Sequence, residues 1–210
     1  MTFTLVKENA AQICIDSHVA DYKGLKHVAK ILAGDILTVT GKEPEIVEQI
    51  QNVPQIVAAT KGTSDILAKW EEEKKIDLSV LEGKREVFMV QLIEEDGAEK
   101  LVIVGTETIA TLYGLYYISE NIGVSPWVYW ADVVPAPKKE IVFDKSICTV
   151  SKEPSVRYRG FFMNDEWPSL GNFVMHTFGD FNEFFYEKVF DLLLRLKGNY
   201  FWPAMWSASL

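Results

Sequence analysis

The chain has 210 residues, of which 48% are hydrophobic, and its 21 basic and 30 acidic side chains give a formal charge of 21 − 30 = −9. These fractions are typical of a globular protein and exclude global disorder, which requires few aromatic and aliphatic residues. Because the chain is acidic and has no basic stripe to neutralise phosphates, nucleic acid is not an expected partner. No window approaches the ~18 consecutive apolar residues of a membrane-spanning helix, so a membrane is not an expected partner either.

The N-terminus lacks the basic stretch and the apolar run of a signal peptide. We therefore expect a cytoplasmic protein, or a secreted one from which a signal peptide has been removed. The two cysteines, Cys14 and Cys148, are too few for a disulfide framework. We expect both to be small buried hydrophobic residues, in preference to a disulfide that joins the ends of a domain.

The first 150 residues alternate between helical and strand patterns. Apolar residues at spacings of three and four predict two helices, and short runs rich in β-branched residues predict three strands. The helices are expected over 18–33 and 108–120, and the strands over 55–59, 87–93 and 101–104. The dipeptide Asp96-Gly97 predicts a hairpin turn between the last two strands. Helices mixed with strands indicate an α/β or α+β layer structure.

The composition changes near residue 150, because residues 151–210 hold fifteen of the 26 aromatic side chains. We therefore predict an N-terminal α/β domain over 1–150 and a second domain over 151–210. The second domain is expected to form strand 157–163, helix 180–198 and strand 199–203. Asp180 and Glu183 have the spacing of a capping box at the start of this helix, with a loop before it.

A strand–helix–strand crossover pairs its strands in parallel, and a parallel sheet must be covered on both faces. Sixty residues cannot complete such a sheet, and a (β/α)8 barrel needs ~250 residues. We therefore expect the second domain to be the first β–α–β portion of a barrel that is cut short.

Several kinds of site are not supported by the sequence. Loops near Gly62 and Gly105 follow predicted strands, but they lack the other glycines of phosphate-binding motifs. His18, His27 and His176 are scattered and have no metal-ligand spacing. We expect neither a nucleotide nor a metal.

An acidic pair gives a better candidate site. Asp165 and Glu166 follow the predicted strand 157–163, at the end where a parallel barrel gathers its active-site loops. Adjacent residues of an extended chain point to opposite sides, so at most one of the two is expected to face the cavity. Tryptophans nearby could stack on sugar rings while the carboxylate accepts hydrogen bonds from hydroxyls. In the alternative interpretation, Asp165 caps a loop and the tryptophans are core residues.

Several long motifs occur together in the chain. In the second domain they are RGFFMNDEWP (159–168), FGDFN (178–182), FYEKVFDLLLRLKGNY (185–200) and WPAMW (202–206), and in the first YGLY (113–116) and GVSPWVYWAD (123–132). These motifs closely resemble glycoside hydrolase family 115, the xylan α-1,2-glucuronidases. The resemblance covers roughly residues 85–206.

This resemblance implies a small α/β domain, like those that precede the barrels of hexosaminidases and other α-glucuronidases, followed by a (β/α)8 TIM barrel. It implies inverting hydrolysis that removes glucuronic acid, or its 4-O-methyl ether, from O2 of xylose, with no metal or organic cofactor. The implied partner is glucuronoxylan or its oligosaccharides. The oligomeric state of the intact enzyme stays open, with a homodimer as one arrangement.

Family members are far longer than this chain, so we expect the principal catalytic acid and base to lie beyond Leu210. The residues that the resemblance assigns to substrate binding are Asp165, Glu166, Asn199, Trp202 and Trp206. Of the acidic pair we prefer Glu166 for contact with sugar hydroxyls, and Asn199 lies nearer the start of its strand.

Two other functions are compatible with the sequence. One is a hexosaminidase-like barrel hydrolase, which would prefer a substrate with an N-acetyl group over a uronic acid. The other is a non-catalytic carbohydrate-binding module built on the aromatic surface, which would bind sugar without hydrolysis.

Overall fold

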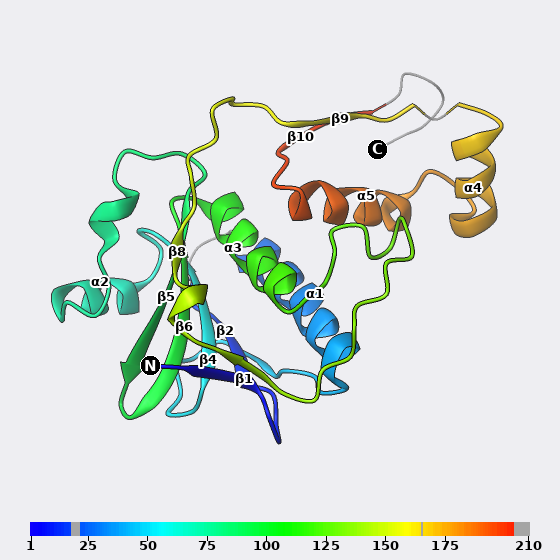
Figure 1. Cartoon of the computed structure of the whole chain (residues 1–210). Coiled ribbons are helices and arrows are strands. Elements are labelled where there is room, and N and C mark those ends of the chain that lie inside the picture. The colour runs from blue at the N-terminus through cyan, green and yellow to red at the C-terminus, as the bar shows by residue number, and fades with distance from the viewer. Residues whose placement is uncertain (18–21, 165, 204–210) are drawn as a thin grey trace.

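The computed structural model describes residues 1–17, 22–164 and 166–203 of the chain (Figure 1). The strands are β1 (Phe3–Val6), β2 (Gln12–Ile15), β3 (Ile46–Val47), β4 (Gln55–Thr60), β5 (Phe88–Glu95), β6 (Ala98–Gly105), β7 (Ile141–Phe143), β8 (Thr149–Val150), β9 (Gly160–Phe162) and β10 (Tyr200–Trp202). The helices are α1 (Tyr22–Thr40), α2 (Asp65–Glu72), α3 (Thr108–Asn121), α4 (Ser169–Phe178), α5 (Glu183–Arg195) and the short 3-10 helices η1 (Leu78–Leu81) and η2 (Lys145–Ile147). None of these described helices is long and apolar enough to cross a membrane.

Six strands form one mixed sheet in the order β3-β2-β4-β6-β5-β8. Strands β2, β3, β4 and β6 run parallel, whereas β5 is antiparallel to both of its neighbours. The predicted hairpin joins β5 to β6, with Asp96 at φ 51° and Gly97 at φ 79°. Positive φ at two successive residues is typical of a two-residue hairpin loop, whose backbone twist matches that of the flanking strands. The mixed α/β class predicted from the sequence is therefore confirmed.

Helices cover both faces of this sheet, as Figure 1 shows. Adjacent strand residues point to opposite faces. Ile56 therefore belongs to the core beneath α1 and α3. Its neighbour Val57 belongs to the core on the α2 side, where Leu67 and Trp70 of α2 are buried. Because both faces are covered, β4 is buried at every residue, as expected of a central parallel strand.

Helix α1 continues beyond the predicted end at residue 33. Ile36 and Val39 extend its apolar stripe and are 0% and 1% exposed, and Gly41 follows the helix with φ 72°. The predicted start at residue 18 lies outside the described residues. Cys14 is buried and free, as predicted. Cys148 is free but exposed, so its predicted burial is wrong: it follows η2, just before the short edge strand β8.

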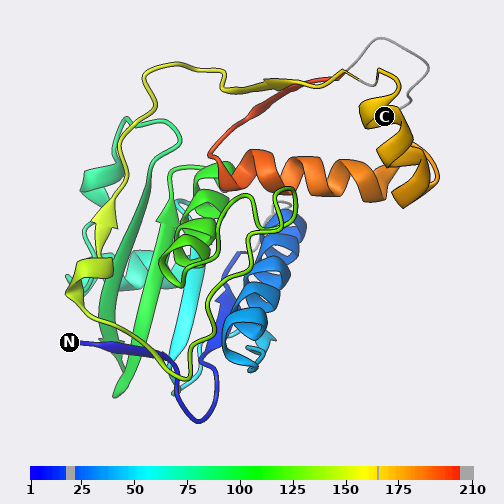
Figure 2. The ribbon, with the colours of Figure 1, turned by 45° about the vertical axis from the view of Figure 1, so that its right-hand side comes forward.

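The C-terminal part contains a second, parallel strand pair. β9 and β10 pair in register, with Phe161 opposite Phe201. These two rings meet edge to face at 5.9 Å, and Phe201 also contacts Tyr186 and Phe190 of α5. The strand pair therefore lies on α5, which in turn crosses the ends of α1 and α3 (Figure 2). This is the predicted parallel β–α–β unit.

The segment between β9 and α5 is not the loop that the sequence predicts, because it contains helix α4. Leu170, Val174 and Phe178 recur at four-residue spacing, and Gly179 with φ 82° ends the helix. Two of these residues pack against Phe185, since Val174 and Phe185 are fully buried in one cluster and the Phe178 ring lies 5.7 Å from that of Phe185.

Helix α5 begins at Glu183, three residues later than predicted. Asn182, not Asp180, is its N-cap, and its Oδ1 accepts hydrogen bonds from the amides of Phe184 (3.1 Å) and Phe185 (3.2 Å). The side-chain Nδ2 of Asn182 also donates to the main-chain carbonyl of Phe178 (3.0 Å) at the end of α4. A carboxylate has no such donor, so Asn182 can join the two helices in a way that Asp180 cannot.

Candidate functional site

The C-terminal ends of β9 and β10 form the candidate site. Their parallel register places Phe162 beside Trp202, and these rings meet edge to face at 6.0 Å. The amide of Met163 donates to the carbonyl of Trp202 (3.0 Å) and extends the pairing by one bond. Glu166 follows β9 a few residues later and Trp202 is the last residue of β10, so these two predicted residues lie at the same edge of the strand pair. Both are exposed.

Helix α4 positions the residues that follow β9. The amide of Gly171 donates to the carbonyl of Glu166 (3.2 Å), which fixes the backbone at that residue. The indole of Trp167 lies against Gly171 so closely that a Cβ on the glycine would be 2.6 Å from a ring carbon. A glycine is therefore required beneath Trp167, whose side chain remains 61% exposed.

Of the other predicted site residues, Asn199 is described by the structure. Asp165 and Trp206 fall outside the described residues. Asn199 precedes β10 and is therefore at the opposite end of the strand pair from Trp202. The structure does not bring Asn199 to the edge that carries Glu166, so its contact with substrate stays a prediction.

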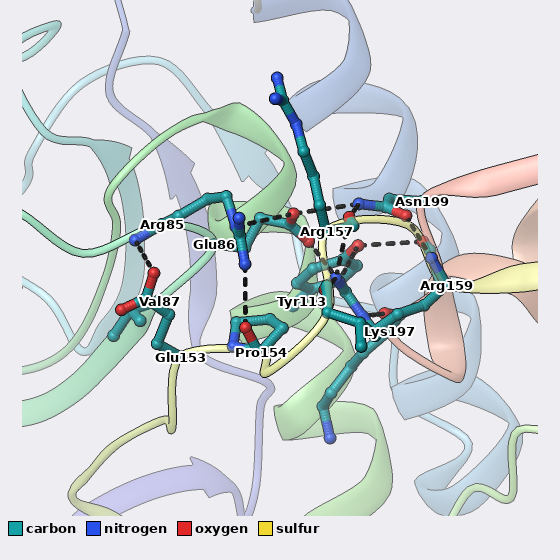
Figure 3. Close-up of polar contacts among 12 residues, drawn as sticks. Arg85, Glu86, Val87, Tyr113, Glu153, Pro154, Arg157, Arg159, Lys197 and Asn199 are labelled. Atoms are coloured by element: carbon teal, nitrogen blue, oxygen red, sulfur yellow. Dashed lines mark hydrogen bonds and ion pairs between the residues drawn. The ribbon is translucent and has the colours of Figure 1, made fainter.

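Asn199 belongs instead to a polar network at the start of both strands (Figure 3). Its Oδ1 accepts from the amide of Arg159 (2.9 Å) just before β9. Its Nδ2 donates to the carbonyl of Arg157 (2.8 Å) and to Oε1 of Glu86 (3.0 Å). Glu86, which precedes β5, thereby connects the N-terminal sheet with β9 and β10.

Glu86 is 6% exposed, and its Oε2 accepts a hydrogen bond from Nη2 of Arg159. This contact raises the pKa of the Arg159 guanidinium. Arg159 also donates from Nε to the carbonyl of Lys197 (3.1 Å), in the turn before β10. Buried Tyr113 of α3 donates to the carbonyl of Gly198 (2.9 Å), and burial, followed by the charge of Glu86, raises its pKa. We call Glu86, Tyr113, Arg159 and Asn199 the Glu86 network.

A second junction links α5 to the N-terminal helices. Asp35 of α1 accepts two hydrogen bonds from the guanidinium of Arg195, at 2.9 and 3.1 Å. Asp191 accepts a third from Nε of Arg195 (2.9 Å) and one from the hydroxyl of Tyr116 (2.8 Å) in α3. Arg195 is 7% exposed, and this bidentate arrangement is the strongest geometry for such a pair. The two junctions fix the strand pair, and hence the candidate site, relative to the sheet.

The chemistry available at the edge is carbohydrate recognition. Exposed tryptophan rings can stack on the apolar faces of sugars, and the carboxylate of Glu166 can accept hydrogen bonds from hydroxyls. Within the described ranges, no group of three or more His, Cys, Asp or Glu residues could hold a metal ion.

The structure thus consists of a three-layer α/β domain joined to a parallel strand pair, with an aromatic and acidic edge at the strand ends. The family model of Glycosyl hydrolase family 115 matches residues 151–210. The chain belongs to this family, because it is also 32% identical over 99% of its length to a solved member.

One solved structure that is similar to this chain is that of BtGH115A, a family GH115 4-O-methyl-α-glucuronidase with specificity for decorated arabinogalactans. It is 32% identical, the match covers 99% of this chain and 26% of that chain, and the TM-score is 0.80. This chain therefore spans about a quarter of the length of that relative. The structure of CpGH84D is 11% identical over 77% of this chain and 23% of that one, with a TM-score of 0.42. No curated protein matches.

Proposed function

We propose that this chain is the N-terminal part of an α-glucuronidase that removes glucuronic acid, or its 4-O-methyl ether, from a branched polysaccharide. The observation that carries the proposal is the site-bearing strand pair β9–β10, in a chain that is 32% identical to a 4-O-methyl-α-glucuronidase over 99% of its length. Glu166 and Trp202, together with Asp165 and Trp206, are the proposed substrate-binding residues.

In this proposal β9 and β10 are the first two strands of a (β/α)8 barrel. Phe161 and Phe201 pack against each other on the α5 side, while Phe162 and Trp202, one residue further along, are 55% and 57% exposed. This alternation is expected when one face of a strand meets the outer helices and the other faces the barrel interior. Inverting hydrolysis needs two carboxyl groups ~6.5–9.5 Å apart, and we place both beyond Leu210.

Two substrates follow from different observations. The resemblance of the sequence motifs to the xylan α-1,2-glucuronidases implies glucuronoxylan, in which the uronic acid is linked α-1,2 to xylose. The relative BtGH115A is specific for decorated arabinogalactans, which makes a glucuronic acid substituent on galactose the second candidate. Both substrates would present the same uronic acid to the ends of β9 and β10. They differ in the polysaccharide chain to which the uronic acid is attached.

The test is release of 4-O-methylglucuronic acid from glucuronoxylan and from decorated arabinogalactan. The intact protein is compared with the 210-residue chain alone. Release by the intact protein only would support the reaction and the placement of the acid and base beyond Leu210. Release by neither protein would overturn the proposal, and release by the short chain would overturn the placement.

A further inference from the structure

The motif GVSPWVYWAD, at residues 123–132, lies outside the proposed active-site edge. It follows α3 and belongs to the N-terminal part of the chain, yet it reaches α5 (Figure 1). Its backbone is held by tight turns, in which Val128 donates to Ser125 (3.0 Å) and Ala131 to Trp127 (2.9 Å). The segment is therefore preorganised.

Trp130 fixes this segment to the C-terminal helices. Its indole N–H donates to the carbonyl of Lys188 in α5 (3.0 Å), and its ring meets that of Phe185 edge to face at 6.2 Å. The ring of Phe173 in α4 lies 6.0 Å away. The motif and α4 therefore meet where Trp130 contacts Phe173.

This contact borders a cleft of about 410 Å³, whose described lining residues are Tyr129, Trp130, Asp132 and Phe173. Its volume lies within the range of small-molecule sites, roughly 300–1,000 Å³. Tyr129 is 38% and Phe173 41% exposed, so each presents ring surface to solvent. Asp132 is exposed and has φ 51°, a left-handed conformation that is uncommon for a residue other than glycine.

The chemistry of the cleft suits a polyhydroxylated ring. The aromatic faces match the apolar C–H face of a pyranose. The carboxylate of Asp132, which lines the cleft, accepts hydrogen bonds from sugar hydroxyls.

The cleft is connected to the candidate active site through α4. Gly171 of this helix supports Trp167, and Phe173 stands two residues further along. We propose that this cleft is a second carbohydrate site, which binds a pyranose residue of the polysaccharide backbone while the uronic acid substituent occupies the edge at Glu166 and Trp202. The choice of a backbone sugar rests on the proposed function.

The test uses the intact protein and two unsubstituted probes, a xylo-oligosaccharide and a galacto-oligosaccharide, because neither carries a uronic acid for the active site. We expect Tyr129→Ala and Phe173→Ala to weaken binding of at least one probe tenfold or more in calorimetry. Asp132→Asn, which retains the left-handed preference, should weaken it less. Phe184→Ala is the matched control, since Phe184 is 62% exposed on α5 and does not line the cleft.

Kinetics provide a second measurement. We expect the Tyr129 and Phe173 variants to raise KM several-fold on the polymer with kcat unchanged, and to leave both constants unchanged on a small aryl glucuronide. Probe binding that survives both substitutions would overturn the inference. An equal rise in KM on the small substrate would also overturn it, because the effect would then arise at the active site.

The two proposals can fail separately. If the intact protein releases no uronic acid but the variants lose probe binding, the proposed function fails and the second site stands. If it releases uronic acid and binds neither probe, the second site fails alone. Probe binding by the 210-residue chain but not by the intact protein would overturn the inference, because the remainder of the protein would then fill the cleft.

Discussion

Glu166 is an exposed residue. Its main-chain carbonyl, not its side chain, accepts the hydrogen bond from the amide of Gly171 near the start of α4. Its side chain can therefore be changed without loss of that contact. We expect Glu166→Gln in the intact enzyme to lower kcat/KM at least tenfold, or ~1.4 kcal/mol of transition-state stabilisation. The matched control is Glu71→Gln, an exposed glutamate on α2. Kinetics equal to those of the unmodified enzyme would defeat the assignment.

The two cysteines should differ in reactivity. Burial, with a smaller effect from Asp16, raises the pKa of Cys14 to about 12, whereas Cys148 is exposed. Because only the thiolate attacks a disulfide reagent, we expect one fast-reacting thiol in the folded chain and two after unfolding. Cys148→Ser should leave no fast thiol. A rapid reaction of that variant would show that Cys14 is accessible.

Glu95 gives the fold a dependence on acid pH. Its side chain is 3% exposed and accepts hydrogen bonds from Lys69 (2.7 Å) and Lys75. Burial by itself would raise the pKa of this carboxyl, but the two ammonium groups outweigh burial and lower it from 4.5 to about 2.

A carboxyl whose pKa is lower in the folded state stabilises the fold above its unfolded pKa, and this contribution is lost as pH falls toward the folded pKa. Glu95→Gln should therefore flatten the decrease in unfolding free energy from about pH 5 to about pH 2. Urea unfolding at several pH values measures it, with exposed Glu94→Gln as the control. A curve for Glu95→Gln as steep as that of the unmodified chain would contradict the prediction.

At the scale of elements, the Glu86 network holds β9 and β10 at their starts. We expect Glu86→Ala to lower the unfolding free energy by about 2 kcal/mol, because it leaves Arg159 and Asn199 without their shared acceptor. Glu86→Gln should cost less, since its amide oxygen still accepts.

Hydrogen exchange localises this effect. The amides of Met163 and Tyr200 bond across the strand pair, to Trp202 and Arg159, and should exchange faster in Glu86→Ala, while those of β4 and β6 should not. Glu71→Ala is the control. Equal acceleration in the large sheet would mean that the network stabilises the whole chain instead of the strand pair.

The elements differ in how well the sequence predicts them. The hairpin at Asp96-Gly97, helix α3 and the parallel pairing of β9 with β10 follow from local patterns, and the structure confirms them. Helix α4 is missed, although its spacing of Leu170, Val174 and Phe178 is visible, because ten residues between turn signals resemble a loop.

The site is predictable only in part. Glu166 and Trp202 could be placed at one edge because Glu166 follows the first strand of a parallel crossover and Trp202 lies toward the end of the second. Glu86 could not be found, since its partners Arg159 and Asn199 are 73 and 113 residues away in the sequence. No periodicity or spacing connects positions so far apart. The same holds for the cleft, whose walls come from the segment after α3 and from α4.

At the scale of the whole molecule, the strand pair has one uncovered face. Four aromatic side chains on and before these strands are exposed: Tyr158 (65%), Phe162 (55%), Tyr200 (46%) and Trp202 (57%). Clustered exposed apolar surface of this kind promotes association.

We expect the 210-residue chain to self-associate at micromolar concentration, as measured by sedimentation velocity. Phe162→Asp should shift it toward monomer. Phe184→Asp should not, because Phe184 is equally exposed but lies on α5, away from this face. A monodisperse monomer with protected β9 and β10 amides would contradict the prediction.

The two junctions limit how the N-terminal part could be exchanged for that of another protein. Asp35 and Glu86 both belong to that part, and each is buried against an arginine of the C-terminal part. A chimera that replaced residues 1–150 without supplying both carboxylates would leave Arg195 with Asp191 alone and would remove the Glu86 contact of the partly buried Arg159, which is destabilising. The N-terminal part is therefore matched to the C-terminal part that follows it and is not an interchangeable module.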